Sequence, residues 1–194
     1  IQSRGFLQTI EHPMLGRYQT LGFPYRLSET PCDLKRPAPL LGQHTGEVFQ
    51  GDASSVVAGF SRHSNMVGPS AQLPLHGFRV LDLGMAVAGP VLSNLLAQAG
   101  ADVIRVESKA REQRARRTGA DSRAILQQVV AYEDYDRMKK QCTINLSTEE
   151  GRSIFLDLVR ISDIVVEGFR QRVPERMDDA DGAVALLDIF HQHP

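Results

Sequence analysis

The second half of the chain alternates short apolar runs with stretches of helical periodicity, and this alternation constrains the fold most strongly. Residues 79–83 (RVLDL) and 102–107 (DVIRVE) have the length and composition of buried strands. Between them, Pro90 fits the first position of a helix, and Gly100 fits the position just after a helix end. A strand, a helix and a second strand form a βαβ unit, which implies parallel strands and a right-handed crossover.

Within this expected helix the apolar residues have the i, i+3, i+4, i+7 spacing of an amphipathic helix. They are Leu92, Leu95, Leu96 and Ala99. A further helix is expected at residues 124–132.

A second strand–helix–strand unit follows. Residues 142–146 and 164–166 are expected strands, and Ser147 with Glu150 has the spacing of a capping box at the start of the helix between them. The apolar face of that helix contains Ile154, Phe155, Leu158 and Val159. Because strands and helices alternate, the sequence predicts an α/β fold, a Rossmann-like doubly wound parallel sheet, from Pro74 onward.

The first part of the chain has a different character. Residues 1–50 are expected to be a small β-rich segment, with two short strands around a turn at 13–16 and recurrent prolines that exclude long regular elements. Residues 51–73 are rich in Gly, Ser, Ala and Pro without a clear period, which is typical of a flexible linker. We therefore divide the chain into residues 1–50, 51–73 and 74–194.

Charge and cysteine content exclude several classes of function. The chain has 22 basic and 23 acidic residues and a formal net charge of -1, so no global field favours nucleic acid or an anionic membrane. Cys32 and Cys142 are 110 positions apart and neither belongs to a CxxC pair. We therefore expect no disulfide framework and no cysteine zinc site, and a reducing cytoplasm is the simpler location.

No apolar run approaches the roughly 18 residues that a membrane span needs, and no signal peptide opens the chain. The chain begins at Ile1 without a methionine and stops at Pro194 directly after a helix-like stretch. We expect a piece of a longer protein.

Two basic features have open interpretations. The stretch 109–117 carries a local excess of positive charge that could hold a phosphate or could be a solvated loop. Lys139 and Lys140 precede an expected strand, where a lysine can contact a phosphate or simply protect a sheet edge.

The loop Gly84 to Pro90 occupies the position of a ligand loop at the end of a parallel strand. Glu107 ends the next strand, 23 residues after Gly84, as the ribose-binding acid of a dinucleotide site would. However, the loop lacks GxGxxG because Ala86 and Val87 occupy the crowded positions. A dinucleotide site is therefore disfavoured.

The histidines predict neither a metal site nor a catalytic triad. His191 and His193 form an HxH pair without further ligands, which favours surface residues. His12 and His44 have no serine or cysteine partner in a nucleophile motif. Three aspartates that lie within or at the start of strands are expected to be structural: Asp82, Asp102 and Asp163.

Longer stretches carry a family resemblance. PLHGFRVLDLGMAVAGPVLSNLLAQAGADVIRVES, KKQCTINLSTEEGRSIFLDLV and SDIVVEGFRQRVPERM follow one another between Pro74 and Met177. They resemble the start of a family III CoA-transferase (the formyl-CoA/carnitine or CaiB/BaiF type). RGFLQTIEHPMLGRYQTLGFPYRLSETP and RPAPLLGQHTGEVF, within residues 4–49, resemble the end of the same family. The resemblance implies that the tail of one copy is joined through the linker to the head of a second, truncated copy.

Members of this family move CoA from an acyl-CoA to a carboxylic acid through a catalytic aspartate, which forms mixed anhydride and thioester intermediates. The resemblance implies that this aspartate lies outside residues 1–194, so we assign no catalytic residue and expect the chain alone to be inactive. It also implies coenzyme A as the acyl-CoA substrate, a small carboxylate as the second substrate, no metal, and a parent protein that is dimeric or pseudo-dimeric through its two copies.

The resemblance further implies CoA contacts. The family's loop after the first strand meets CoA through backbone groups, which here belong to Ala86 and Val87. The family's lysine before the third strand corresponds to Lys139, which would face a CoA phosphate.

Later positions match the family in part. Phe169 corresponds to an aromatic residue that flanks adenine, whereas Gly168 replaces the family's asparagine. Arg176 and Met177 match the family's arginine and its hydrophobic neighbour. Ser108 replaces a basic residue and weakens one phosphate contact. The alternatives to a CoA-transferase are a non-catalytic CoA- or nucleotide-binding module and a dinucleotide-dependent oxidoreductase.

Overall fold

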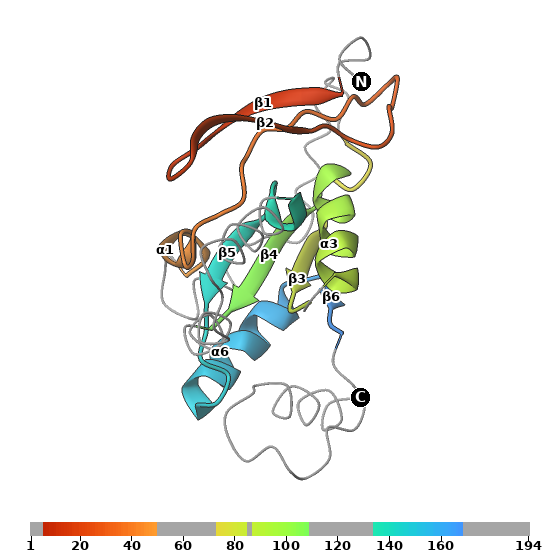
Figure 1. Cartoon of the computed structure of the whole chain (residues 1–194). Helices are drawn as coiled ribbons and strands as arrows, with labels where there is room; N and C mark the ends of the chain where they lie inside the picture. Colours follow the sequence, from red (N-terminus) through yellow and green to blue (C-terminus); the bar gives the residue numbers. More distant parts are fainter. Residues whose placement is uncertain (1–5, 50–72, 85–86, 109–133, 169–194) are drawn as a thin grey trace.

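The computed structural model describes residues 6–49, 73–84, 87–108 and 134–168 (Figure 1). Its central element is a four-stranded sheet with the order β5-β4-β3-β6, in which every pairing is parallel. The strands are β3 (Arg79–Asp82), β4 (Asp102–Glu107), β5 (Lys140–Thr143) and β6 (Ile164–Val166). From β3 the chain steps outward through β4 to β5 and then returns to the other side of β3, so the direction of winding reverses between β3 and β6.

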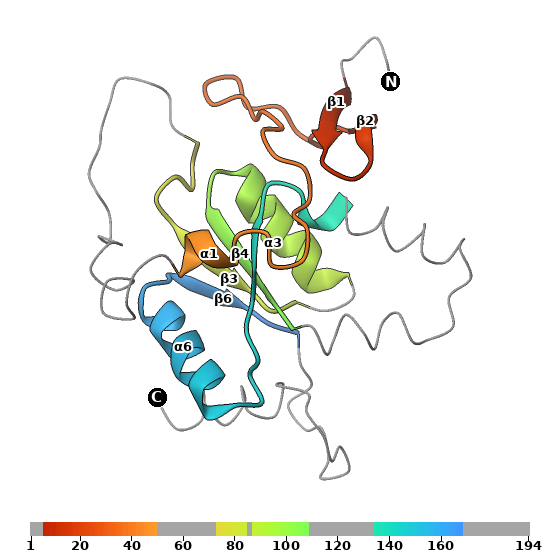
Figure 2. The same cartoon turned by 90° about the vertical axis from the view of Figure 1, so that its left-hand side faces the viewer.

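Helices cover both faces of this sheet, as Figure 2 shows for α3 (Ala88–Gln98) and α6 (Glu149–Arg160). Side chains of successive strand residues alternate between the faces. Val80 and Val103 pack with Ala97 of α3. Leu81 packs in the opposite core cluster, with Phe155 of α6. The α/β doubly wound architecture predicted from the alternating pattern is confirmed.

The predicted strand boundaries agree well, except for β5. β4 and β6 have the predicted bounds, and β3 ends one residue early. β5 spans Lys140–Thr143 instead of residues 142–146, because its ladder to β4 begins where Lys140 pairs with Ile104. Of the apolar run 142–146, only residues 142 and 143 belong to the strand, and residues 144–146 follow it.

Only part of the predicted apolar stripe of α3 packs on the sheet: Leu96 lies against the cluster that contains Val80 and Val103. Leu92 is 50 % exposed and Leu95 is 39 % exposed, whereas Ser93, Asn94 and Gln98 are buried. The polar face can be buried because each of these side chains donates a hydrogen bond, although Oε1 of Gln98 has no partner. The Ser93 hydroxyl donates to Asp82, the Asn94 amide donates to the Arg137 carbonyl oxygen at 2.8 Å, and the Gln98 amide donates to Asn94. A hydrophobic pattern does not detect such a face.

The start of α6 also differs from the predicted capping box. Thr148, not Ser147, is the N-cap, and its Oγ1 accepts the Gly151 N–H at 3.1 Å. The Ser147 hydroxyl donates instead to Oδ1 of Asn145 at 2.6 Å. The cap therefore lies one residue later than predicted. The predicted apolar face is confirmed: Phe155 and Leu158 are buried, while Ile154 and Val159 pack against them partly buried.

The N-terminal segment contains the predicted hairpin and one short helix that the sequence did not predict. β1 (Leu7–His12) pairs antiparallel with β2 (Gly16–Leu21), with Leu7 opposite Leu21. The helix α1 (Thr45–Val48) lies beside β5 (Figure 1). The Arg137 guanidinium joins the hairpin to the rest of the molecule, because it donates to Oγ1 of Thr20 at 3.2 Å and to the Leu21 carbonyl oxygen.

Residues just before and within α1 supply partners to the outer edge of β5. The Gln141 carbonyl oxygen accepts the His44 N–H at 3.0 Å, and the Gln141 N–H donates to Nδ1 of His44 at 3.1 Å. The Thr143 N–H donates to Oγ1 of Thr45 at 3.2 Å. Val48, 4 % exposed, joins the core cluster on the α6 face. The N-terminal segment is thus packed against the sheet that follows it in sequence.

Several expectations concern residues outside the described ranges. These are the linker at 51–73, the basic stretch at 109–117, the helix at 124–132, and His191 with His193. Among the described residues, no helix is long and apolar enough to cross a membrane.

Candidate functional site

The candidate site lies where β3 ends and the chain turns into α3. This is the point at which the winding of the sheet reverses, the position where open α/β sheets bind ligands. Gly84 and Gly89 bring the two ends of the connecting loop into contact: a Cβ atom on Gly89 would lie 2.7 Å from the Gly84 Cα, closer than Cβ atoms approach other atoms. Only residues without a Cβ allow the strand end and the helix start to approach this closely.

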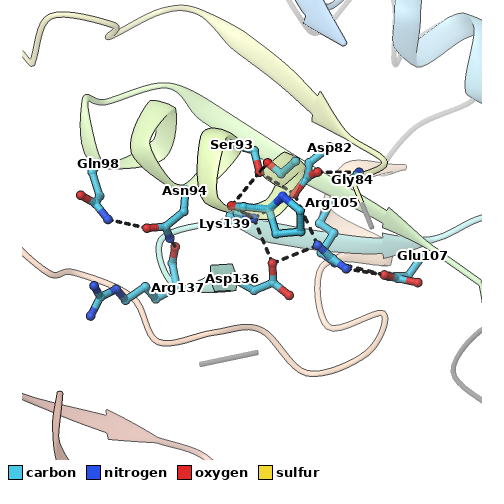
Figure 3. A network of polar contacts seen from close by, with 12 residues as sticks. Asp82, Gly84, Ser93, Asn94, Gln98, Arg105, Glu107, Asp136, Arg137 and Lys139 are labelled. Atoms are coloured by element: carbon cyan, nitrogen blue, oxygen red, sulfur yellow. Dashed lines mark hydrogen bonds and ion pairs between the residues drawn. The ribbon is translucent and has the colours of Figure 1, made fainter. Parts of the chain in front are cut away.

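Asp82, the last residue of β3, accepts hydrogen bonds from residues on both sides of this loop. It is completely buried. Its Oδ1 accepts the Gly84 N–H at 2.8 Å, and its Oδ2 accepts the Ser93 hydroxyl at 2.7 Å (Figure 3). One carboxylate therefore links the start of the loop to the second turn of α3.

Lys139 reaches the same carboxylate from the residue before β5, and it is also completely buried. Its Nζ donates to Oδ2 of Asp82 at 2.8 Å, to Oδ1 of Asp136 at 2.9 Å and to the Pro90 carbonyl oxygen at 3.1 Å. An ammonium has three donors, and these three acceptors use them all. Lys139 therefore does not serve simply to protect a sheet edge. Its contact with a CoA phosphate stays a prediction.

Arg105 completes the buried network (Figure 3). Its Nε and Nη2 donate to Oε1 of Glu107 at 3.1 and 2.7 Å, and its Nη1 lies 3.1 Å from Oδ1 of Asp136 and 3.5 Å from Oδ2 of Asp82. Glu107, which a dinucleotide site would present to a ribose, is 7 % exposed and faces this guanidinium. The geometry of Glu107 thus gives no support to the dinucleotide alternative.

The charges in the network control the ionisation of Asp82. Burial by itself would raise the pKa of Asp82, but the neighbouring Lys139 and Arg105 cations, with hydrogen bonds from Lys139 and Ser93, hold that pKa below its usual value. The carboxyl group is therefore ionised at neutral pH, and both of its oxygens accept hydrogen bonds.

Of the six predicted CoA-contact residues, the structure describes two. Val87 precedes the first residue of α3, is 55 % exposed, and makes no side-chain hydrogen bond that caps the helix. Lys139 lies beneath the loop. The other four lie outside the described residues: Ala86, Phe169, Arg176 and Met177. The structure therefore brings Val87 and Lys139 to opposite sides of one loop.

The sequence reasoning missed the role of Asp82 and its partners in supporting this loop. Asp82 was expected to be structural, and Ser93, Arg105 and Asp136 received no role. A signal existed: charged Asp82 and Arg105 interrupt two runs that otherwise have the composition of buried strands. A charge in a buried strand needs an opposite charge nearby, so these residues predict one another.

Two histidines have structural roles. Nδ1 of His12 accepts the backbone N–H groups of Met14 and Leu15, at 3.1 and 3.2 Å, in the hairpin turn. His44 bonds to the edge of β5. Within the described ranges, no group of three or more His, Cys, Asp or Glu residues is arranged to hold a metal ion.

The parallel sheet, the reversal of winding at β3 and the tight glycine-containing loop define a doubly wound α/β protein with a tight loop at its switch point. The family model of CoA-transferase family III matches residues 1–45 and 75–184. The chain belongs to CoA-transferase family III.

Named relatives agree with this assignment. The alpha subunit of succinyl-CoA–L-malate CoA-transferase from Chloroflexus aurantiacus is 36% identical over 126 residues, which cover 65% of this chain and 29% of that protein. Succinate–glutarate CoA-transferase from Agrobacterium fabrum is 34% identical over 109 residues, covering 53% and 27%. A crystal structure of a CaiB/BaiF family protein from Brucella suis is 34% identical, with a TM-score of 0.40, and the match covers 50% of this chain and 26% of that one. The chain therefore matches less than a third of these relatives.

Proposed function

We propose that the full-length protein transfers CoA from an acyl-CoA to a small carboxylic acid. The family match over residues 1–45 and 75–184 carries this proposal. Relatives that are named for their reactions support it, because their names give succinyl-CoA with L-malate and succinate with glutarate as substrates. These substrates share one chemistry: a CoA thioester and a short-chain carboxylate.

The loop between β3 and α3 is our proposed CoA contact. The N–H groups at a helix start attract anions, and CoA carries phosphates. At the start of α3 no side chain caps these groups, and Val87 is exposed. We propose that backbone groups of Ala86 and Val87 bind CoA. The contacts expected of Phe169, Arg176 and Met177 belong to the same proposal. The contact expected of Lys139 with a phosphate would require its Nζ to exchange one of its three buried acceptors.

The transfer chemistry needs a carboxylate nucleophile, which the family resemblance assigns to an aspartate outside residues 1–194. That carboxylate attacks the thioester and releases the CoA thiolate, which leaves a mixed anhydride. The thiolate then attacks the aspartyl carbonyl, which frees the donor acid and gives an aspartyl thioester. The acceptor carboxylate repeats the two steps in reverse order and leaves as the new acyl-CoA.

We further propose that the parent protein is a tandem, two-copy member. Residues 1–50 would end the first copy, 51–73 would be the linker, and 74–194 would begin the second. The order of the two resemblances supports this, because a tail-like stretch precedes a head-like stretch. Bacterial dimethylsulfoniopropionate CoA-transferase/lyase has such an architecture, so we propose dimethylsulfoniopropionate as an acceptor acid, with release of dimethyl sulfide, and a parent that is dimeric or pseudo-dimeric.

An exchange assay on the full-length protein tests the proposal. Succinyl-CoA or acetyl-CoA with isotopic label in the CoA moiety is incubated with malate, glutarate or dimethylsulfoniopropionate, and the acyl-CoA products are separated by mass. We expect the label in the CoA thioester of an acceptor acid, and dimethyl sulfide in the headspace for the third acid. CoA binding without exchange would indicate a binding module instead. Tighter binding of NADH than of CoA would indicate an oxidoreductase.

A further inference from the structure

We propose that Asp82 is a positioning residue for the loop between β3 and α3, and that Lys139 helps to position the loop by linking the Asp82 carboxylate to the first turn of α3. This inference rests on the proposed CoA function of that loop. Asp82 is buried below the loop, so it acts through the groups that it holds and does not touch the substrate.

The carboxylate holds the two ends of the loop to one point. Oδ1 binds the Gly84 N–H, two residues after Asp82, while Oδ2 binds the Ser93 hydroxyl, one turn into α3. The Ser93 oxygen also lies 3.0 Å from the Gly89 carbonyl oxygen, within the first turn of the helix. A change in the Asp82 carboxylate therefore alters the start and the end of the loop together.

Lys139 adds a third attachment. Its Nζ bridges Oδ2 of Asp82 and the carbonyl oxygen of Pro90, so the first turn of α3 is attached to the same carboxylate through the ammonium. Together, Asp82, Ser93 and Lys139 hold the described residues on both sides of the loop (Figure 3). In sequence, Val87 lies between those attachments.

The backbone next to Lys139 has an uncommon conformation. Met138 has a φ of 70°, a left-handed conformation that a residue with a side chain rarely adopts. The Met138 N–H donates to the Arg36 carbonyl oxygen at 3.1 Å, and the Lys139 N–H donates to the Asp136 carbonyl oxygen at 3.2 Å. Such a conformation persists where neighbouring contacts impose it.

Sheet stability alone does not require this arrangement. Burying a lysine and an aspartate is expensive, and apolar residues of similar size often stabilise a core equally well or better. Besides its ion pairs with Lys139 and Arg105, Asp82 accepts hydrogen bonds from Gly84 and Ser93, both of which belong to the loop and its helix. The geometry therefore connects the charge at position 82 with the placement of the loop.

The test uses the full-length protein with a charge-balanced pair of substitutions, Asp82→Asn with Lys139→Met. The pair removes one acidic and one basic group, so the net charge of the buried network is unchanged. The amide introduced at position 82 still offers an oxygen to the Gly84 N–H, but the attachments of the helix start through Lys139 are lost. The control variant is Asp102→Asn, which removes a strand carboxylate that Arg79 and Lys140 bind at the opposite end of β4.

We expect the paired variant to raise KM for the acyl-CoA donor about tenfold, with a smaller change in kcat. A tenfold rise corresponds to the loss of one or two hydrogen bonds. Hydrogen exchange should accelerate at the backbone amides of residues 84, 87–89 and 91 but not in α6. The control should leave KM and the exchange of the loop unchanged. An equal KM in the paired variant and the control would overturn the inference.

Ser93→Ala provides a second measurement that does not depend on tolerance of the pair, because it deletes only one hydroxyl. It should raise KM about fivefold, as expected for one hydrogen bond. If Ser93→Ala leaves KM unchanged, the inference is wrong. If the wild-type protein neither binds nor transfers CoA, the proposed function fails and the inference fails with it. If the wild type is active and the variants match it, only the inference fails.

Discussion

A Cβ atom on Gly89 would lie 2.7 Å from the Cα atom of Gly84, so the end of β3 and the first turn of α3 touch through their backbones. We expect Gly89→Ala to lower the free energy of unfolding by about 1–3 kcal/mol, because the backbone of the loop must move to admit the methyl group. Urea unfolding followed by circular dichroism measures this change.

Gly46→Ala is the matched control for this substitution. Gly46 lies in α1, and a Cβ atom there would meet no other atom within 4 Å. The control should change the free energy of unfolding by about 1 kcal/mol or less, with stabilisation as the expected direction. Equal losses in the two variants would show that the contact between Gly84 and Gly89 does not restrict position 89.

The contact of His44 with β5 predicts a loss of stability in acid. Burial, with the cations of Arg36 and Lys140 acting against the carboxylate of Glu47, lowers the pKa of His44. Nδ1 accepts the Gln141 N–H, so this nitrogen must carry no proton in the folded state. The unfolded chain binds a proton more readily than the folded one. The contribution of His44 is therefore complete above about pH 6.5 and decreases as the pH falls through the lower, folded pKa.

The free energy of unfolding, measured between about pH 7.5 and 5, tests this expectation. His44→Asn supplies a side-chain oxygen as the acceptor and does not titrate. Its stability should depend less steeply on pH than that of the wild type. If the two pH profiles are parallel, protonation of His44 is not linked to folding.

Attachment of the N-terminal segment should depend on apolar burial more than on charge. Val48 is 4 % exposed, and Val48→Ala should lower the free energy of unfolding by about 2 kcal/mol. The Glu47 carboxylate lies 2.9 Å from Nζ of Lys140, but its side chain is 52 % exposed, so Glu47→Gln should change stability by less than about 1 kcal/mol.

Limited proteolysis of the two variants provides the measurement for this segment. Cleavage within residues 31–49 should accelerate in Val48→Ala and stay close to the wild-type rate in Glu47→Gln. The opposite order would mean that the ion pair, not the buried side chain, attaches the segment to β5.

The two cysteines should differ in reactivity. Burial raises the pKa of the Cys142 thiol to about 12, whereas Cys32 is partly exposed. Because the thiolate is the reactive form, native protein at about pH 8 should release one equivalent of thionitrobenzoate from a disulfide reagent, and a second only after unfolding. Cys32→Ser should abolish the first equivalent. A rapid reaction of Cys142 in that variant would show that its burial is transient.

The sheet could be predicted because the apolar composition of each strand, and the order of strands and helices along the chain, can be read from short stretches of sequence. Residues 102–107 are almost entirely buried and contain three β-branched apolar residues, Val103, Ile104 and Val106, so strand position and parallel pairing follow from pattern and spacing. The helix cap at Thr148 was missed by one residue because Ser147 and Thr148 both carry hydroxyl groups with cap potential.

The support of the loop could not be predicted in the same way. Asp82, Ser93 and Lys139 are separated by 11 and 46 positions, and their contacts depend on how α3 is rotated on the sheet. Hydrophobicity predicted the rotation only in part: Leu96 packs on the sheet, but Leu92 and Leu95 are exposed while a serine, an asparagine and a glutamine are buried. Hydrogen bonds between distant residues decide which face of this helix turns inward.

His44 and Thr45 precede the linker in the sequence, but they pack against β5, which follows it. Cutting between residues 50 and 73 would leave the main-chain groups of Gln141 and Thr143 without these partners. A bare strand of this kind recruits foreign strands and promotes aggregation. A recombinant product that starts near Pro74 would therefore expose the outer edge of β5. Expression boundaries should keep residues 1–50 and 74–194 in one polypeptide.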